Sequence, residues 1–400
     1  MTSTATAPDG RAAYWADELW DTVVAGDEPS AAWTAFAALR AGLDKETVLL
    51  DVIGAVQRRV GKEWADNRMT VAQEHAATAI NERVVAALAR SEAPPGAPAP
   101  PAPRSPEPPA AAPGSHDTVS SRHDPAAARP YPGGSRPGPG EPARPRITVS
   151  CVDGEWHALP ARLLAEVLSL RGWHVDFLGA QVPTAHLVTH LHHTGADVVA
   201  LSGSLATRLP TAHAAISACR SAGVPVLAGG AAFGPGGRHA ELLGADLWAS
   251  DARSAAARLA GGPPPRPAGD PLTDESLKHL LDQEYTLISR AAGQLVRATL
   301  QGVGARYPAM RDYTAPQQQH TAEDVAHIVA FLGAALYVDD GDMFTAFACW
   351  TNDILAARHV PTESLLHALD VLGAEVRDFP RATAMLRQAA EVLRTPGPGE

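Results

Sequence analysis

A carboxylate and an imidazole stand two residues apart, at Glu155 and His157, just after the apolar run at residues 147–152. Neutral imidazole is a good ligand for transition metals such as cobalt. A carboxylate that accepts a hydrogen bond from the second ring nitrogen fixes the tautomer and raises the basicity of the ligating nitrogen. The pair is therefore a candidate metal-ligating histidine with its supporting carboxylate, although the same pattern taken alone also suits an ordinary polar loop.

The elements around this pair predict where it lies. Between residues 144 and 262, five short apolar or β-branched runs alternate with helical segments, which predicts a parallel sheet of flavodoxin-like, Rossmann-like order 2-1-3-4-5. Ligands of such sheets bind outside the carboxyl ends of the strands, at the switch point between the first and third strands. His157 follows the first predicted strand, Ser202 ends the third, and Gly229 and Gly230 end the fourth. We therefore expect these residues to converge on one crevice.

The rest of the chain divides into helical segments and linkers. Apolar residues at helical spacing over residues 11–92 predict a bundle of four helices. Residues 93–143 are mostly Pro, Ala, Gly and Ser, a composition typical of a disordered linker. A second Pro/Gly-rich linker is predicted at 263–273, and amphipathic segments over 274–395 predict a third, all-α domain.

Charge and composition exclude several classes of function. The formal net charge is −11 and no dense Lys/Arg stripe occurs, so we expect neither nucleic acid nor an anionic membrane surface as a partner. The three cysteines, Cys151, Cys219 and Cys349, show no CxxC spacing, which argues against disulfides and structural zinc. No signal-like start and no run of eighteen apolar residues is present, so the expected location is the cytoplasm.

The segment 146–262 resembles the cobalamin-binding domain of corrinoid methyltransferases, mutases and CarH-type photoreceptors. The resemblance is carried by Glu155-x-His157, by Ser202 with its following leucine, and by the Gly229-Gly230 pair. It implies that His157 is the lower axial cobalt ligand, displacing the cofactor's own dimethylbenzimidazole, with Glu155 supporting it. The glycine that ends the family motif is Pro160 here; proline suits a first helical turn but adds bulk. The cofactor contacts so implied also include Trp156, Ser202, Leu205, Thr207, Gly229 and Gly230.

The helical segment before this domain resembles the cap of methionine synthase and of CarH-type proteins. The spacing W-x9-E-H, at Trp64, Glu74 and His75, resembles the photoreceptor branch. There the Trp shields the upper axial 5′-deoxyadenosyl group, the Glu contacts it, and the His coordinates cobalt after light breaks the cobalt–carbon bond. Without the resemblance, a packed Trp and a solvated Glu-His pair account for the same residues. The helix-turn-helix domain of CarH-type repressors is not expected here.

The C-terminal segment carries polar anchors of the kind that an open-chain tetrapyrrole requires, because propionates pair with Arg or His and the rings need apolar or aromatic walls. The order of cap, cobalamin domain and globin-like helical domain resembles the photocobilins, which implies biliverdin in the third domain. Without that resemblance, a dimerisation or docking bundle accounts for the segment. The candidate pigment contacts are Arg306, Tyr313, His320, His327, Trp350 and Arg358.

The sequence thus predicts a light receptor that binds adenosylcobalamin and biliverdin, rather than an enzyme acting on a diffusible substrate. Its partner is expected to be a second copy of the chain or a downstream signalling protein. The alternative is a corrinoid protein that carries a methyl group for a methyltransferase system, because the cap and His157 fit both. A third hypothesis is a scaffold whose C-terminal bundle only dimerises.

Overall fold

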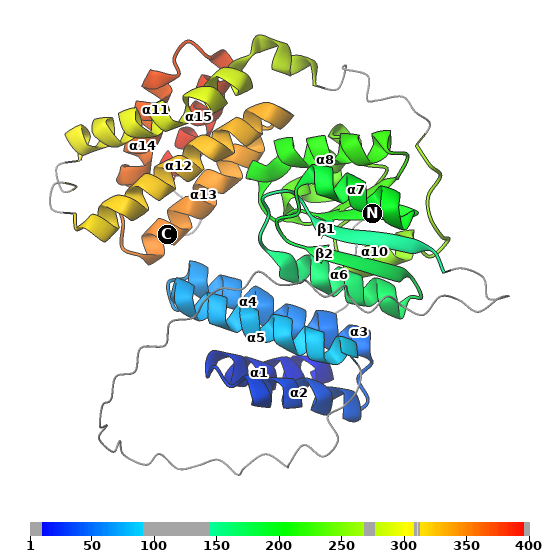
Figure 1. Ribbon diagram of the computed structural model, residues 1–400. Coiled ribbons are helices and arrows are strands. Elements are labelled where there is room, and N and C mark those ends of the chain that lie inside the picture. Colours follow the sequence, from blue (N-terminus) through cyan, green and yellow to red (C-terminus); the bar gives the residue numbers. More distant parts are fainter. Residues whose placement is uncertain (1–9, 91–143, 268–276, 308–309, 311–312, 396–400) are drawn as a thin grey trace, which may run out of the picture.

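The computed structural model describes residues 10–90, 144–267, 277–307, 310 and 313–395. The linker predicted at 93–143 and most of the one predicted at 263–273 lie outside these residues. The chain is mostly helical with one five-stranded parallel sheet: a helical cap, an α/β domain and a C-terminal helical domain (Figure 1).

The cap is a bundle in which one long helical segment is interrupted by a π-helical turn. Asp27 and Asp44 each accept a backbone hydrogen bond at a helix start, from Ser30 N (3.1 Å) and Thr47 N (2.9 Å), which fixes where those helices begin. Leu49 lies in the π-helical turn and is fully buried in the bundle core. The elements are α1 (Gly10–Val24), α2 (Glu28–Arg40), α3 (Lys45–Thr47), the π-helical turn (Val48–Ile53), α4 (Gly54–Ala65) and α5 (Val71–Arg90).

The α/β domain has the strand order β2-β1-β3-β4-β5 with every neighbouring pair parallel, as the sequence predicted. β1 (Arg146–Cys151), β3 (Val198–Ser202) and β4 (Val226–Gly229) form the centre, and β2 (His174–Gly179) and β5 (Leu247–Ala249) form the edges. The register pairs Cys151 with Ser202 and Ser202 with Gly229, so the carboxyl ends of the three central strands are level.

Helices cover both faces of this sheet, which explains why its central strands are buried throughout. α6 and α10 pack on one face, and α7, α8 and α9 pack on the other. The connecting elements are α6 (Ala158–Leu170), α7 (Thr184–Thr194), α8 (Leu209–Ser221), α9 (Arg238–Leu242), α10 (Ala252–Arg258) and the 3-10 turns Ala206–Arg208, Ala231–Phe233 and Pro235–Gly237.

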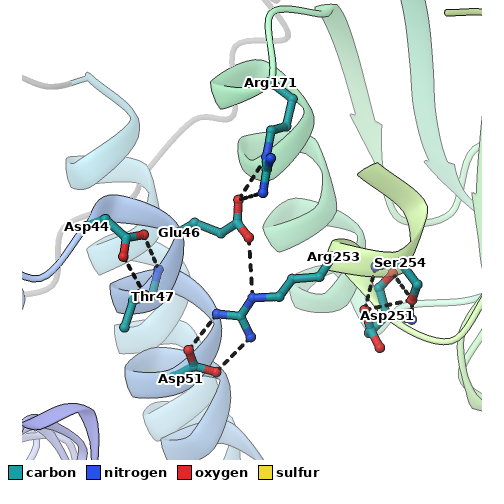
Figure 2. Close-up of polar contacts among 8 residues, drawn as sticks. All are labelled: Asp44, Glu46, Thr47, Asp51, Arg171, Asp251, Arg253 and Ser254. Carbon is teal, nitrogen blue, oxygen red and sulfur yellow. Dashed lines mark hydrogen bonds and ion pairs between the residues drawn. The ribbon is translucent and has the colours of Figure 1, made fainter. Parts of the chain in front are cut away.

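The cap rests on α6 of the α/β domain. Leu159 and Leu163 of α6 are buried in the same apolar cluster as the core of the cap. Beside this contact, Glu46 forms ion pairs with Arg171 (2.8 Å) and Arg253 (3.3 Å) (Figure 2). Arg253 also donates two hydrogen bonds to the carboxylate of Asp51, at 2.5 and 2.9 Å. Individual exposed ion pairs contribute little free energy, so the buried apolar side chains provide most of the stabilisation of this contact. The ion pairs fix the orientation of the cap relative to the α/β domain.

The third domain is entirely helical over the residues described, with Phe344, Leu332 and Leu372 fully buried in its core. Glu284 is buried and accepts hydrogen bonds from the N–H groups of Arg381 (3.0 Å) and Ala382 (2.9 Å), which places a negative charge at the start of α15. The elements are the 3-10 turn Lys278–Asp282, α11 (Glu284–Arg306), α12 (Ala315–Val338), α13 (Gly341–Ala357), α14 (Thr362–Glu375) and α15 (Pro380–Arg394).

One helix, α12, bears on the sequence-based expectation that the chain contains no membrane-spanning segment. Among the helices described, it alone contains a stretch, Gln317–Val338, that is long and apolar enough to cross a membrane. Half of that stretch is buried within the fold, where it contributes Leu332 and Leu336 to the core of the third domain. The composition of α12 therefore matches that of a core helix.

The third domain is docked on the α/β domain at the turn between α12 and α13. Val338 is buried in the apolar cluster of the α/β domain. His239 Nε2 donates to Asp340 Oδ2 at 2.7 Å, and Arg238 forms an ion pair with the same carboxylate. Asp340 also caps α13 through Met343 N (3.0 Å). One buried carboxylate thus joins the two domains and starts a helix.

Candidate functional site

The predicted pair Glu155 and His157 lies at the carboxyl end of β1, and Glu155 is completely buried. Glu155 Oε1 accepts hydrogen bonds from His157 Nδ1 (2.5 Å), His157 N (3.0 Å) and Trp156 N (2.9 Å). Its Oε2 accepts from Ser204 N (2.8 Å) and Leu205 N (3.1 Å). One carboxylate therefore ties the loop after β1 to the loop after β3, across the predicted switch point.

The electrostatics of this pair favour a ligating imidazole. Burial alone would raise the pKa of Glu155, but the hydrogen bonds from His157 and Ser204 outweigh it and lower that pKa to about 2. The carboxylate is therefore ionised at neutral pH and accepts a hydrogen bond from Nδ1–H, so Nε2 is the ring nitrogen that can offer a lone pair to a metal. The His157 side chain is 41% exposed, and its Nε2 makes no hydrogen bond within the described ranges. That atom is available to a metal.

The backbone at the end of β4 has a conformation and a close neighbour that require glycine. Gly230 has a φ of +102°, and a Cβ built on it would lie 2.3 Å from Gly203 O. Gly203 N in turn donates to Gly229 O at 3.0 Å. Gly230 thus lets the loop after β3 approach closely, and the predicted contact of the glycine pair with the cofactor stays a prediction. Pro160 lies in the first turn of α6, as expected.

The cap brings its own imidazole to the same place. His75, the fifth residue of α5, has its ring centroid 5.5 Å from that of Trp156, and the Trp156 centroid lies 4.9 Å from that of His157. Both imidazoles therefore contact one indole, which is 51% exposed. Glu74 Oε2 is 2.7 Å from His75 Nδ1. The structure thus brings together the cap and sheet residues predicted for opposite faces of one cofactor.

The remaining cap and sheet candidates take different positions. Ser202 is buried at the end of β3, and Thr207 lies in the 3-10 turn that follows. Trp64 lies at the end of α4, where its ring centroid is 6.3 Å from that of Trp350 in the third domain.

Arg358 joins the third domain to the same corner of the cap. Its guanidinium carbon lies 5.5 Å from the Trp64 ring centroid, and its nitrogens donate to Trp64 O and Ala65 O, each at 3.3 Å. These are terminal carbonyls of α4, which lack partners within the helix, so a cation is favoured there. Two residues predicted to hold a pigment thus contact the cap.

The other four pigment candidates do not form one cluster. Arg306 is exposed at the end of α11 and pairs with no residue that the structure describes. His320 and His327 are exposed on α12, and their charges, with that of Arg358, lower the pKa of Asp324 against a larger increase from burial. Burial also raises the pKa of Tyr313. Two of the six candidates, His320 and His327, therefore lie on α12, and Arg306 lies on α11.

We expect Arg358→Ala to loosen the contact between the third domain and the cap. The change removes a cation–π contact and two hydrogen bonds to helix-terminal carbonyls, so the free energy of unfolding should fall by about 1–2 kcal/mol. Denaturant titration followed by tryptophan fluorescence measures this change, because Trp64 and Trp350 both report on the contact. Arg306→Ala is the matched control and should have no effect. Equal behaviour of the two variants would contradict the assigned contact.

Sequence reasoning missed one residue beside this site. Arg208, at the end of the 3-10 turn Ala206–Arg208, lies against Gly154, and its Nε is buried without a hydrogen-bond partner. No motif marks such a residue, because its position depends on how two loops from different strands meet.

Comparison with known proteins gives a family match for the two domains that form this site. Residues 145–260 match a family model described as a B12 binding domain, and residues 15–89 match a second model with the same description. Comparison with curated proteins finds no match.

Three solved structures are similar to the chain. The monomethylamine corrinoid protein of Methanosarcina barkeri is 16% identical, with a TM-score of 0.43, over 62% of this chain and 98% of that one. A novel cobalamin-binding protein from Desulfitobacterium hafniense DCB-2 is 15% identical, with a TM-score of 0.28, over 61% and 96%. The methanol:cobalamin methyltransferase complex MtaBC from Methanosarcina barkeri is 13% identical, with a TM-score of 0.27, over 65% and 85%.

The residues present fit a cobalt corrinoid. An imidazole whose tautomer is fixed by an ionised carboxylate offers a free Nε2 to the metal, and an orphaned guanidinium nitrogen lies at the same edge of the sheet. These observations and the two family matches agree: the helical cap and the α/β domain of this chain form a cobalamin-binding module.

Proposed function

We propose that the chain holds cobalamin between cap and sheet, with His157 Nε2 as the lower axial ligand. The observation that carries this proposal is the 2.5 Å contact between Glu155 and His157 Nδ1, which directs Nδ1 to the carboxylate and leaves Nε2 as the ring nitrogen that can bind a metal. Glu155 holds the imidazole in place through its bonds to the loop after β3. On the cap side, Trp64, Glu74 and His75 supply the upper face of the site.

A bound alkylcobalamin supplies a cobalt–carbon bond that is broken either by transfer of the alkyl group to an acceptor or by light. The first candidate use is that of a corrinoid protein that carries a methyl group for a methyltransferase. A cap and an α/β domain are the parts that such a carrier needs, and the two family matches cover both. In this use, His157 would adjust the reactivity of the cofactor from its lower face. The cap would move away from the upper face to admit the partner enzyme.

The second candidate use is that of a light receptor with adenosylcobalamin and, in the third domain, biliverdin. The contacts of Trp350 and Arg358 with Trp64 favour it, because they connect the predicted upper face of the cofactor to the third domain. Loss of the group that Trp64 covers would then alter the packing of the third domain against the cap. A second copy of the chain or a downstream protein would bind according to that packing. In this use the chain is a cytoplasmic regulator that turns over no diffusible substrate.

Reconstitution separates the two uses. The apoprotein is incubated with adenosylcobalamin, methylcobalamin and biliverdin, and visible spectra are recorded before and after green and red light. A receptor should retain adenosylcobalamin and a stable long-wavelength pigment band, and light should convert the cobalamin; His75→Ala should change only the light product. Retention of methylcobalamin alone favours the carrier. Failure to retain any cobalamin would refute both.

A further inference from the structure

Among the residues that the structure describes, none forms a hydrogen bond or ion pair with the side chain of Arg208. It closes the 3-10 turn between β3 and α8, at the edge of the sheet where His157 lies. Its side chain forms no hydrogen bond or ion pair within the described parts of the chain, and its Nε atom is buried. Partial burial of a cation without an anion is unfavourable. The arrangement therefore calls for an anionic ligand.

The position of the guanidinium is set by the loop that carries the cobalt ligand. A Cβ on Gly154 would lie 2.9 Å from Arg208 Nη1 and 3.1 Å from its Cζ, so the guanidinium is packed against the Gly154 backbone. Gly154 also has a φ of +78°, which favours glycine. His157 follows three residues later. Arg208 thus borders the cobalamin site.

The carboxylates nearest to Arg208 in the loop are already engaged. Asp153 Oδ2 accepts from Thr184 N (3.3 Å), in the first residue of α7. Both oxygens of Glu155 are occupied by donors from its own loop and from the loop after β3. Neither carboxylate neutralises Arg208, so its charge remains for a bound molecule.

We propose that Arg208 binds the phosphodiester in the nucleotide loop of the cofactor. This inference rests on the proposed binding of cobalamin. The phosphodiester is the one anionic group of cobalamin, since the corrin side chains are neutral amides. A planar guanidinium matches two phosphate oxygens better than an ammonium does. Arg208 is thus a specificity residue that distinguishes complete cobalamins from corrinoids that lack the nucleotide.

The test compares two corrinoids that differ in this group. Apoprotein is titrated with hydroxocobalamin and with aquacobinamide, which lacks the nucleotide and its phosphate, and binding is followed by visible absorbance. Arg208→Ala should weaken hydroxocobalamin binding by about 10- to 100-fold, the effect of losing a charged hydrogen bond. Its affinity for aquacobinamide should match that of the wild type. Arg208→Lys should give an intermediate loss for hydroxocobalamin alone.

Controls separate the possible failures. Arg258→Ala removes an exposed arginine of the same domain, on α10, and should leave both affinities unchanged. The melting temperature of apo Arg208→Ala should not fall, because the change removes an unpaired cation. Equal losses for the two corrinoids, or no loss for either, would overturn the role of Arg208 while cobalamin binding by the wild type stands. If the wild type bound neither corrinoid, the proposed function itself would fail.

Discussion

Replacement of His157 by alanine is expected to abolish the spectrum of histidine-coordinated cobalamin and to weaken cobalamin binding by more than about 100-fold. Loss of a group that only supports a metal ligand already costs roughly 10- to 100-fold in metal affinity, and here the ligand itself is lost. The variant should fold normally, because the imidazole is 41% exposed and fills no buried core position. Visible absorbance during titration with hydroxocobalamin measures both effects.

His193→Ala provides the matched control for this experiment. His193 is exposed at the carboxyl end of α7 in the same domain, at the edge of the sheet opposite the site, so its removal deletes an imidazole away from the cofactor. The control should reproduce the wild-type spectrum and affinity. A His157→Ala protein with unchanged colour and affinity would show that the cofactor takes its lower ligand from elsewhere.

Changes at Glu155 are expected to have the second largest effect, and two variants separate its two roles. Glu155→Gln keeps the volume but lacks the charge and one acceptor oxygen, so it should weaken cobalamin binding by about 10- to 100-fold. Glu155→Ala should in addition lower the free energy of unfolding by about 2–4 kcal/mol, because it leaves the partly buried N–H groups of Ser204 and Leu205 without an acceptor. Titration with hydroxocobalamin and denaturant unfolding of the apoprotein measure the two quantities.

Glu323→Gln is the control for the loss of a carboxylate, since Glu323 is exposed on α12 and pairs only with other exposed side chains. It should change neither cobalamin affinity nor stability. If Glu155→Gln bound cobalamin as tightly as the wild type, the carboxylate would have no part in tuning the imidazole, and its role would be confined to joining the loops.

Two helices of the third domain begin at residues that local signals select. α12 begins at Ala315 because Thr314 and Gln317 form a capping box. α15 begins at Pro380, because proline suits the first helical turn. Both signals are present in the sequence, and they concern single helix starts.

The sequence by itself determined the strand order, the alternation of strand and helix, and the pairing of Glu155 with His157. Each depends on residues close together in the chain: periodicity selects the element, and two residues at the end of a strand reach each other without help from the rest of the fold. The parallel sheet then brings the strand ends level, which is why a site at the switch point was predictable.

Only the tertiary structure decided which residues meet across domains. Trp350 and Arg358 contact Trp64, and Asp340 contacts His239, because the three domains pack in one arrangement. Such contacts depend on how the domains are oriented relative to one another, and local periodicity and residue spacing in the sequence carry no information on that orientation. The unpaired charge of Arg208 has the same origin, since it depends on which loop packs against it and on which carboxylates that loop has already engaged.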